Sequence, residues 1–349
     1  MPEAADDSKL LAAAAVALNQ HAAVLREIGS AFDAAGHELY LVGGSVRDAF
    51  LGRLGAGPDF TTDLDFTTDA RPDQIQQIVR RWADSVWDTG IEFGTIGVGK
   101  GDYRLEITTF RADTYDQVSR NPEVRFGDRL DDDLVRRDFT VNAMAVRVTA
   151  SGPGEFLDPL NGLAALRAQV LDTPSAPEVS FGDDPLRMLR AARFVSQLGF
   201  IVAPRVRTAI SEMAPQLGRI SAERVAAELD KLVLGADPVA GIDLLVQTGM
   251  GEVVLPEVGG MQMAIDEHHQ HKDVYQHSLT VLRQAIALEG RPPDGGPDLV
   301  LRWAALLHDI GKPATRRHEA DGGVSFHHHE VVGAKMVRKR LRELKYSKQ

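Results

Sequence analysis

The sequence predicts an α+β protein whose first part, residues 1–150, is mixed α/β and whose remainder is helical. Three observations support this prediction. Short strand-like runs, either alternating or leading into glycine, occur in the first part. From Pro185 onward nearly every segment has the apolar spacing of a helix, interrupted by glycine and proline. At 349 residues, the chain also has room for about two or three domains.

Within the first part, apolar spacing predicts a helix over residues 8–36 that ends at Gly36. The period then changes, and residues 39–42 form a short buried strand that leads into Gly43-Gly44. Further segments are predicted as two strands, 93–98 and 104–110, and as one helix, 72–82. We expect these elements to build one mixed α/β domain.

The composition is that of a globular protein, with 44% hydrophobic and 26% charged residues. No run approaches the roughly 18 apolar residues that a membrane helix needs. The acidic start of the chain lacks the positive region of a secretory signal. The absence of cysteine excludes disulfides and cysteine-ligated zinc. We therefore expect a cytoplasmic protein with no membrane partner.

The net charge of −11 argues against a nucleic-acid partner, because phosphate binding usually shows as a basic surface. An RNA site would need a local concentration of basic residues. Residues 181–232 contain eight Lys or Arg against six Asp or Glu, and residues 335–349 contain seven against one. Neither stretch shares the acidity of the whole chain.

The most informative stretch joins the glycine turn Gly43-Gly44 to two carboxylates, Asp63 and Asp65. Glycine lets the backbone approach a ligand closely. The residues that follow, 45–47, would begin a helix whose amides and arginine attract a phosphate. Asp63 and Asp65 are two residues apart, so on a strand they share one face. Such a pair repels unless a cation lies between them, and Mg²⁺ prefers oxygen ligands of this kind.

A third carboxylate, Glu106, would complete a two-metal site in which one ion activates an RNA 3′-hydroxyl and the other holds a triphosphate. Simpler interpretations exist for each part. An isolated Asp-x-Asp is usually a solvated loop and Gly-Gly alone is usually a turn. Glu106 is equally compatible with the outer face of an edge strand. The ordered combination between strand-like segments favours the catalytic interpretation.

Four segments in order resemble the family of class II CCA-adding enzymes and bacterial poly(A) polymerases, with actinobacterial CCA tRNA nucleotidyltransferases as the nearest type. They lie between about residues 37 and 232: Gly43–Asp48, Asp63–Asp65, Arg136–Ala143 and Asp184–Arg187. The resemblance implies a polymerase β-like nucleotidyltransferase head followed by an all-helical neck and body. It also implies a template-independent enzyme that extends RNA 3′ ends with two Mg²⁺ ions.

The resemblance implies a nucleotide pocket in the head. The arginine at Arg137 would contact the incoming nucleotide, and the acid at Asp138 would be associated with its sugar. The residues expected to bind nucleotide in the head are Gly43, Gly44, Ser45, Arg47, Arg137, Asp138 and Asn142. The alternative for residues 136–142 is a salt-bridged turn.

A helix that begins near Asp184 carries Asp184, Arg187, Arg190 and Arg193, each three residues apart, along one slowly rotating stripe. By composition alone this stripe is a solvated, salt-bridged face. The resemblance implies that Asp184 and Arg187 bind the edge of the incoming base, and that Arg190 and Arg193 help to hold the nucleotide. An Arg and an Asp together offer the donors and acceptors needed to select C and A. The family commonly has Glu at the position of Asp183.

The last third of the chain is rich in histidine, and Leu306–Pro313 resembles the signature of HD-domain metal-dependent phosphohydrolases. The resemblance implies that His277, His308 and Asp309 bind a divalent transition metal or Mg²⁺. His329 matches a further histidine of that family. No Asp follows His329 in this chain. We therefore expect an HD fold without phosphohydrolase turnover, the alternative being histidines that only pack or cap helices.

These observations predict an enzyme that adds CCA to tRNA 3′ ends from CTP and ATP. Poly(A) polymerases share the pocket motifs, but an HD domain accompanies some CCA-adding enzymes and favours CCA addition. A tRNA-binding protein with an inactive transferase site and a phosphohydrolase are the remaining alternatives. The predicted domains are a head (1–150), a neck and body (151–265) and an HD domain (266–349). We expect the last to be incomplete, because no helix-closing residue ends the sequence, and we expect a surface loop at 290–297.

Overall fold

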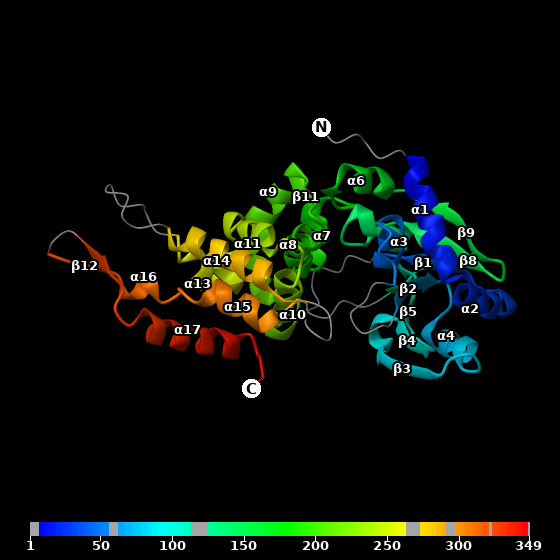
Figure 1. Ribbon diagram of the computed structural model, residues 1–349. Helices are drawn as coiled ribbons and strands as arrows, with labels where there is room; N and C mark the ends of the chain where they lie inside the picture. Colours follow the sequence, from blue (N-terminus) through cyan, green and yellow to red (C-terminus); the bar gives the residue numbers. More distant parts are fainter. Residues whose placement is uncertain are drawn as a thin grey trace. The chain divides into compact units, whose positions relative to one another are not determined.

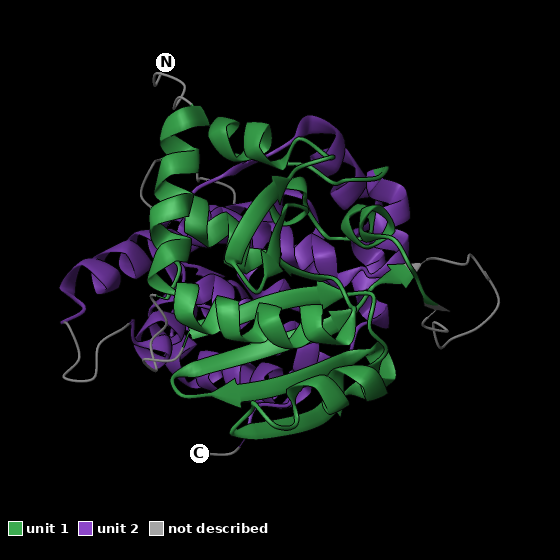
Figure 2. Cartoon of the chain, turned by 90° about the vertical axis from the view of Figure 1, so that its right-hand side faces the viewer, with its two compact units in different colours: residues 1–176 green, residues 177–349 purple. Residues whose placement is uncertain are grey.

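A computed structural model describes residues 7–55, 62–112, 125–262, 273–290, 297–320 and 323–347. The chain forms two compact units, residues 1–176 and 177–349. Figure 2 shows that unit 1 combines a sheet with helices, whereas unit 2 is built almost wholly of helices. The predicted α+β class, with the strands first and the helices after them, is confirmed.

Unit 1 is organised around a seven-stranded sheet with strand order β3-β4-β5-β2-β1-β8-β9. β2 and β5 run parallel, and the other neighbours pair antiparallel. The strands are β1 (Leu39–Val42), β2 (Thr62–Thr68), β3 (Ser85–Gly90), β4 (Thr95–Lys100), β5 (Tyr103–Thr109), β8 (Ala145–Thr149) and β9 (Gly152–Leu157). Short strands β6 (Arg111–Ala112) and β7 (Arg125–Phe126) form a separate pair, and β10 spans Val170–Leu171.

The helices of unit 1 support this sheet. Its α-helices are α1 (Asp7–Gln20), α2 (Ala22–Ala35), α3 (Gly44–Phe50), α4 (Pro72–Val79), α5 (Leu130–Val135) and α6 (Gly162–Ala168), with 3-10 turns η1 (Ile91–Phe93) and η2 (Thr140–Asn142). α2 packs against β8 and β9, and α4 packs against β4 and β5 (Figure 1). Ile28 of α2 and Ile75 of α4 are fully excluded from solvent.

The alternation of side chains along β2 separates core from site. Leu64 and Phe66 are each 1% exposed, and they pair in register with the buried Leu105 and Ile107 of β5. Residues at alternate positions of a strand point to opposite faces. Burial of one set of residues therefore fixes Asp63 and Asp65 on the opposite face of the sheet.

Two expected elements differ in detail. The helix predicted over 8–36 is two helices, because the backbone breaks at His21 (φ −105°, ψ 11°), although it does end at Gly36. The strand predicted at 93–98 begins only at Thr95, because residues 91–93 form a 3-10 turn that closes at Gly94 with φ 79°. Strands β3, β8 and β9 were not predicted.

Unit 2 is a helical assembly. Its helices are α7 (Pro177–Asp183), α8 (Leu186–Leu198), α9 (Pro204–Met213), η3 (Ala214–Arg219), α10 (Ala222–Val233), α11 (Pro238–Gln247), α12 (Met250–Val254), α13 (Pro256–Gly259), α14 (Val274–Leu288), α15 (Leu299–Leu307), α16 (Lys312–Thr315) and α17 (His329–Glu343). β11 spans Ile201–Val202, and β12 (Arg317–His318) pairs with β13 (Val324–Ser325). α8 packs against α10 and α11, and α14 packs against α15.

Local features mark the ends of two helices. Ser221 precedes α10, and its side chain accepts a hydrogen bond from the amide of Arg224. α17 ends at Glu343, and Lys345 follows with φ 63°. The loop predicted at 290–297 lies largely outside the described residues, which omit 291–296. Among the helices that are described, none is long and apolar enough to span a membrane.

Candidate active site and metal centre

Asp63 and Asp65 lie on β2 with their side chains on one face of the sheet, as their spacing predicts. Asp63 is exposed and Asp65 is partly buried. The amide of Asp65 donates to Ser45 Oγ at 2.9 Å, so α3 is tied directly to this strand. Ser45 therefore positions the carboxylate-bearing backbone rather than the carboxylate itself.

Glu106 lies on β5 directly beside Asp65, because the two residues are partners in the parallel register of β2 and β5. β5 is enclosed between β4 and β2. The alternative that placed Glu106 on an edge strand is therefore wrong. The three carboxylates share one face of two adjacent strands. Arg104 Nη2 lies 3.6 Å from Glu106 Oε1 and lowers the negative charge at this end of the group.

Gly43 brings the glycine turn against this carboxylate group. Its φ of +67° is a conformation that L side chains rarely adopt. A Cβ at this position would lie 3.0 Å from Arg137 Nη1 and 3.6 Å from Asp65 Oδ2. The missing side chain thus leaves room at the turn for the Arg137 guanidinium and the Asp65 carboxylate. Arg137 Nη2 also lies 3.0 Å from Asp133 Oδ2, which holds the guanidinium in place.

A buried hydrogen-bond network supports the turn from behind. Arg47 Nη1 donates to Asn142 Oδ1 at 2.8 Å, and its Nε and Nη2 donate to the two oxygens of Asp48 at 2.9 Å. Asn142 Nδ2 donates to Asp138 Oδ1 at 2.9 Å, and the amide of Phe139 donates to the same oxygen. Arg47, Asp138 and Asn142 are each less than 9% exposed. In this arrangement these three predicted nucleotide ligands connect α3 to η2.

Arg111 is a cation near the head pocket that the sequence did not single out. Burial lowers the pKa of Arg111, the carboxylate of Asp133 raises it, and the neighbouring Arg136 and Arg137 lower it further. Its Nη2 donates to Thr95 Oγ1 at 3.4 Å. Arg111 therefore lies in one charged group with Asp133, Arg136 and Arg137. A lone arginine at the end of a strand carries no sequence signal for such a role.

The predicted base-selecting residues lie at the start of α8. Asp184 Oδ1 accepts the amide of Leu186 at 3.1 Å, and its Oδ2 lies 2.8 Å from Arg224 Nη2 of α10. Arg187 Nη1 donates to Ser180 Oγ at 2.8 Å. The sequence missed Arg224 and Ser180, because they come from other helices and lie outside the three-residue spacing.

The far end of the stripe is buried. Arg193 Nε lies 3.0 Å from Glu228 Oε2, and their side chains are 11% and 7% exposed. Both arginines of this end also lie over Phe194, at 4.3 Å for Arg193 and 5.8 Å for Arg190. A uniformly solvated face, the simplest interpretation of the stripe, is therefore wrong for Arg193.

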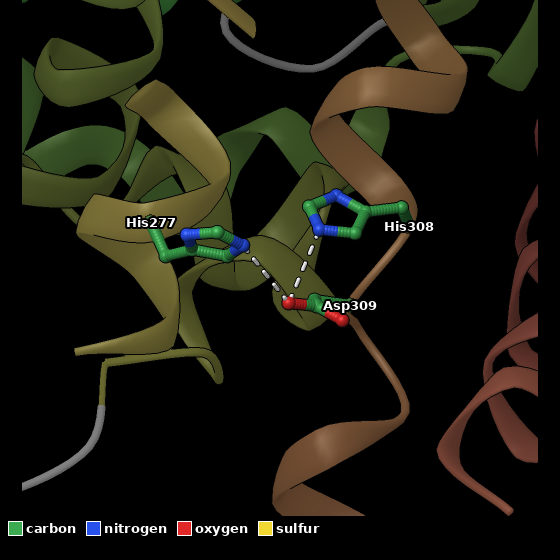
Figure 3. A group of neighbouring side chains, drawn as sticks. All are labelled: His277, His308 and Asp309. Carbon is green, nitrogen blue, oxygen red and sulfur yellow. Dashed lines mark ion pairs between the residues drawn. The ribbon is translucent and has the colours of Figure 1, made fainter. Parts of the chain in front are cut away.

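A second group of candidate ligands lies in unit 2, where His277 of α14 and His308-Asp309 after α15 converge (Figure 3). Asp309 Oδ2 lies 3.5 Å from His277 Nε2 and 3.1 Å from His308 Nε2. His329, at the start of α17, places its Nε2 3.5 Å from the other oxygen, Oδ1. Asp309 is only 2% exposed. Lys312 Nζ donates to Asp309 Oδ2 at 2.7 Å.

Two of these rings are oriented by the backbone. His308 Nδ1 lies 2.9 Å from the Ala305 carbonyl oxygen, and His329 Nδ1 lies 2.9 Å from that of Phe326. A carbonyl oxygen only accepts, so in each ring Nδ1 carries a proton, and Nε2 is the nitrogen that faces Asp309. This is the arrangement that metal-binding histidines use.

Three segments of the chain match known families. Residues 39–172 match the poly A polymerase head domain, residues 199–260 match the "probable RNA and SrmB- binding site of polymerase A", and residues 274–348 match the HD domain. The first match contains the carboxylate face and the glycine turn, and the third contains the histidine group.

Curated relatives align with most of the chain. The chain is 40% identical over 248 residues to the CCA-adding enzyme of Lacticaseibacillus paracasei, and 39% identical over 279 residues to that of Bacillus velezensis. These alignments cover 71% and 79% of this chain but 58% and 61% of the relatives. The chain therefore spans about three fifths of the length of the relatives it matches.

Solved structures share the fold. The CCA-adding enzyme of Bacillus stearothermophilus in complex with CTP has a TM-score of 0.59 at 28% identity, covering 92% of this chain and 82% of that one. The Thermotoga maritima CCA-adding enzyme complexed with tRNA has a TM-score of 0.60 at 23% identity, covering 93% and 66%. The second likeness is one of fold alone.

A poly A polymerase-type head followed by an RNA-binding segment and an HD domain defines a class of nucleotidyltransferase-related proteins. Within it, the chain belongs to the family of class II CCA-adding enzymes and bacterial poly(A) polymerases, as its motifs predicted.

Proposed function

We propose that this chain holds the catalytic head and the nucleotide-selecting helix of an enzyme that adds CCA to tRNA 3′ ends from CTP and ATP. The observation that supports this most strongly is the carboxylate face, with Asp63, Asp65 and Glu106 side by side against the Gly43 turn. The relatives are named CCA-adding enzymes, and one solved relative is in complex with CTP. A cytoplasmic location and the domain limits predicted from the sequence belong to the same proposal.

The donor set fits magnesium, because three carboxylates on one face repel one another unless cations lie between them. When bound by Asp63, Asp65 and Glu106, two Mg²⁺ ions would activate the RNA 3′-hydroxyl and neutralise charge on the triphosphate and departing pyrophosphate. Arg137, held by Asp133 beside the turn, would donate to the nucleotide phosphates or ribose. Arg47, Asp138 and Asn142 would keep Gly43, Gly44 and Ser45 in place through their buried network.

In unit 2, Asp184 and Arg187 would select the base. Asp184 accepts and Arg187 donates, so together they can address the pairing edge of C or A and leave the groups of U and G mismatched. Arg190 and Arg193 would support this helix, since Arg193 is held in a buried ion pair. Replacing Arg187 with Ala should weaken discrimination against UTP more than it weakens metal binding. Unchanged discrimination would contradict the assignment.

Poly(A) addition is the alternative product, because the same pocket residues serve both reactions. The names of the relatives favour CCA. The test supplies the purified chain with a tRNA that ends before CCA, together with CTP, ATP or both. We expect two C residues followed by one A when both nucleotides are present. Long A tracts from ATP alone, with no incorporation of C, would overturn CCA addition in favour of poly(A) addition.

We further propose that the histidine group of unit 2 binds a divalent metal through His277, His308, Asp309 and His329. The support is the convergence of three Nε2 atoms on one buried carboxylate, with two tautomers fixed by backbone carbonyls. Binding of Mn²⁺ or Zn²⁺, measured by calorimetry, should be lost in His308→Ala. It should persist in His318→Ala, which replaces an exposed histidine of β12. Equal binding by both variants would contradict the site.

A further inference from the structure

One side of α17 carries basic side chains that neither proposed site uses. α17 contacts the rest of unit 2 through Gly333, which is buried against Gly311, and through Arg340, whose Nε lies 3.0 and 2.9 Å from the carboxylate oxygens of Glu257. Beyond its last turn, Leu344 is 6% exposed. The opposite side presents four exposed residues that we call the basic face: Lys335, Arg338, Lys339 and Arg342. In Figure 1, α17 (red) lies at the boundary of the described part of its unit.

The basic face is continuous. Its residues lie at positions i, i+3, i+4 and i+7, which share one side of a helix and span about 10 Å along its axis. Lys339 has a distant acidic neighbour, with its Nζ 3.9 Å from Glu343 Oε1. Lys335, Arg338 and Arg342 have no acidic partner among the residues that the structure describes. A chain of net charge −11 thus concentrates unneutralised positive charge on one helix.

Helix stability does not account for this arrangement. Cations stabilise a helix only near its C-terminal turn, where they meet the negative end of the dipole. Arg342 lies in that turn, whereas Lys335 and Arg338 lie one to two turns earlier. Like charges three or four residues apart repel each other and destabilise the helix. The face therefore carries an electrostatic cost within the isolated chain, which an external polyanion would relieve.

We propose that the basic face of α17 binds the phosphate backbone of the RNA substrate. This proposal rests on the proposed function, which supplies RNA as the partner. Exposed Lys and Arg at helical spacing contact phosphates without reading bases, and they fix the position of the bound nucleic acid. The face therefore raises affinity for tRNA of any sequence and leaves nucleotide choice to the pocket.

The test compares tRNA binding by the parent chain with that of K335Q/R338Q/K339Q/R342Q. A matched variant, K9Q/R80Q/R81Q/R283Q, removes the same charge from exposed residues of other elements. Affinity for a tRNA lacking CCA is measured by fluorescence anisotropy at several salt concentrations, without nucleotide. We expect the first variant to bind tRNA at least about tenfold more weakly, because it loses phosphate contacts. Each lost contact should also lower the slope of log affinity against log salt concentration by roughly one. The matched variant should retain the affinity and slope of the parent.

Incorporation of CMP at saturating tRNA separates this proposal from the proposed function. The basic-face variant should keep the parent rate, because no substituted residue lies in the head or on α8. Parental affinity and salt slope in the basic-face variant would overturn the proposal, and so would an equal loss in the matched variant. If the parent binds tRNA but incorporates no nucleotide, the proposed function fails while the binding comparison still decides the role of α17.

Discussion

Replacing Gly43 with Ala tests how the glycine turn serves the carboxylate face. The backbone at Gly43 has φ +67° and ψ −136°, a region that costs about 1–3 kcal/mol for a residue with a side chain. The new Cβ would lie 3.0 Å from Arg137 Nη1, so the guanidinium must move by a few tenths of an ångström or more. Misplacement of a positioning group by about 1 Å can lower a rate by roughly 10²-fold. We expect Gly43→Ala to lose about 1–3 kcal/mol of stability and one to two orders of magnitude in CMP incorporation.

The matched control is Gly36→Ala. Gly36 also has a positive φ, +77°, but a Cβ there would meet nothing within 4 Å. It should therefore show a backbone cost of about 1–2 kcal/mol with incorporation unchanged. Urea unfolding gives the stabilities, and single-turnover incorporation into tRNA gives the rates. Parental incorporation by Gly43→Ala, or equal losses in both variants, would refute the role of Gly43 in placing Arg137.

Three further changes test other parts of the molecule. Asp63→Ala and Asp65→Ala should each lower the rate of incorporation by at least roughly 10³-fold, because the carboxylates that hold the ions contribute several kcal/mol. The control Asp73→Ala on α4 should keep the parent rate, and retained activity in Asp63→Ala or Asp65→Ala would contradict the metal assignment. Glu228→Ala should lower the free energy of unfolding by roughly 3–5 kcal/mol, because Arg193 stays buried without its partner. Replacing the exposed Glu223 of the same helix with Ala should change that free energy by less than about 0.5 kcal/mol, and similar losses in both variants would argue against a buried pair. Hydrogen bonds from Arg302 hold the pKa of Glu289 below its usual range, so Glu289→Gln should destabilise the protein at pH 7. A carboxyl group whose pKa is lowered in the folded state stabilises the fold only while it is ionised. The difference in free energy of unfolding between Glu289→Gln and the parent should therefore shrink as the pH falls below about 4.5, and a difference independent of pH would contradict this.

The sequence predicted the parts of the fold that local patterns encode. The strand at residues 39–42 is uniformly buried and leads into glycine, and Gly36 closes α2 through backbone hydrogen bonds. β3 escaped prediction because its side chains are mostly exposed and show no apolar alternation. β9 was not predicted because it contains Gly152, Pro153 and Gly154, which have a low propensity for strands. Its position is fixed by pairing with β8.

The candidate site divides in the same way. The shared face of Asp63 and Asp65 follows from their spacing, but the place of Glu106 beside Asp65 depends on a parallel register between strands about forty residues apart in sequence. The partners of the α8 stripe could not be predicted from the sequence either. Arg224 and Glu228 meet α8 only because α10 packs against it, and no spacing within one helix reports a contact between two.

The α8 stripe was predicted either as a salt-bridged face or as a protein template for the base, and under the proposed function these two roles occupy different ends. The Asp184–Arg224 pair is 31% and 52% exposed, so it contributes only about 0–1 kcal/mol and can be exchanged for a ligand at little cost. The Arg193–Glu228 pair is buried, and separating it would leave an uncompensated charge at a cost of roughly 3–5 kcal/mol. Under the proposed function, a nucleotide can therefore recruit Asp184 by replacing a weak partner, while Arg193 must remain in place. The rigid end fixes the helix, and the exchangeable end is the one suited to address the base.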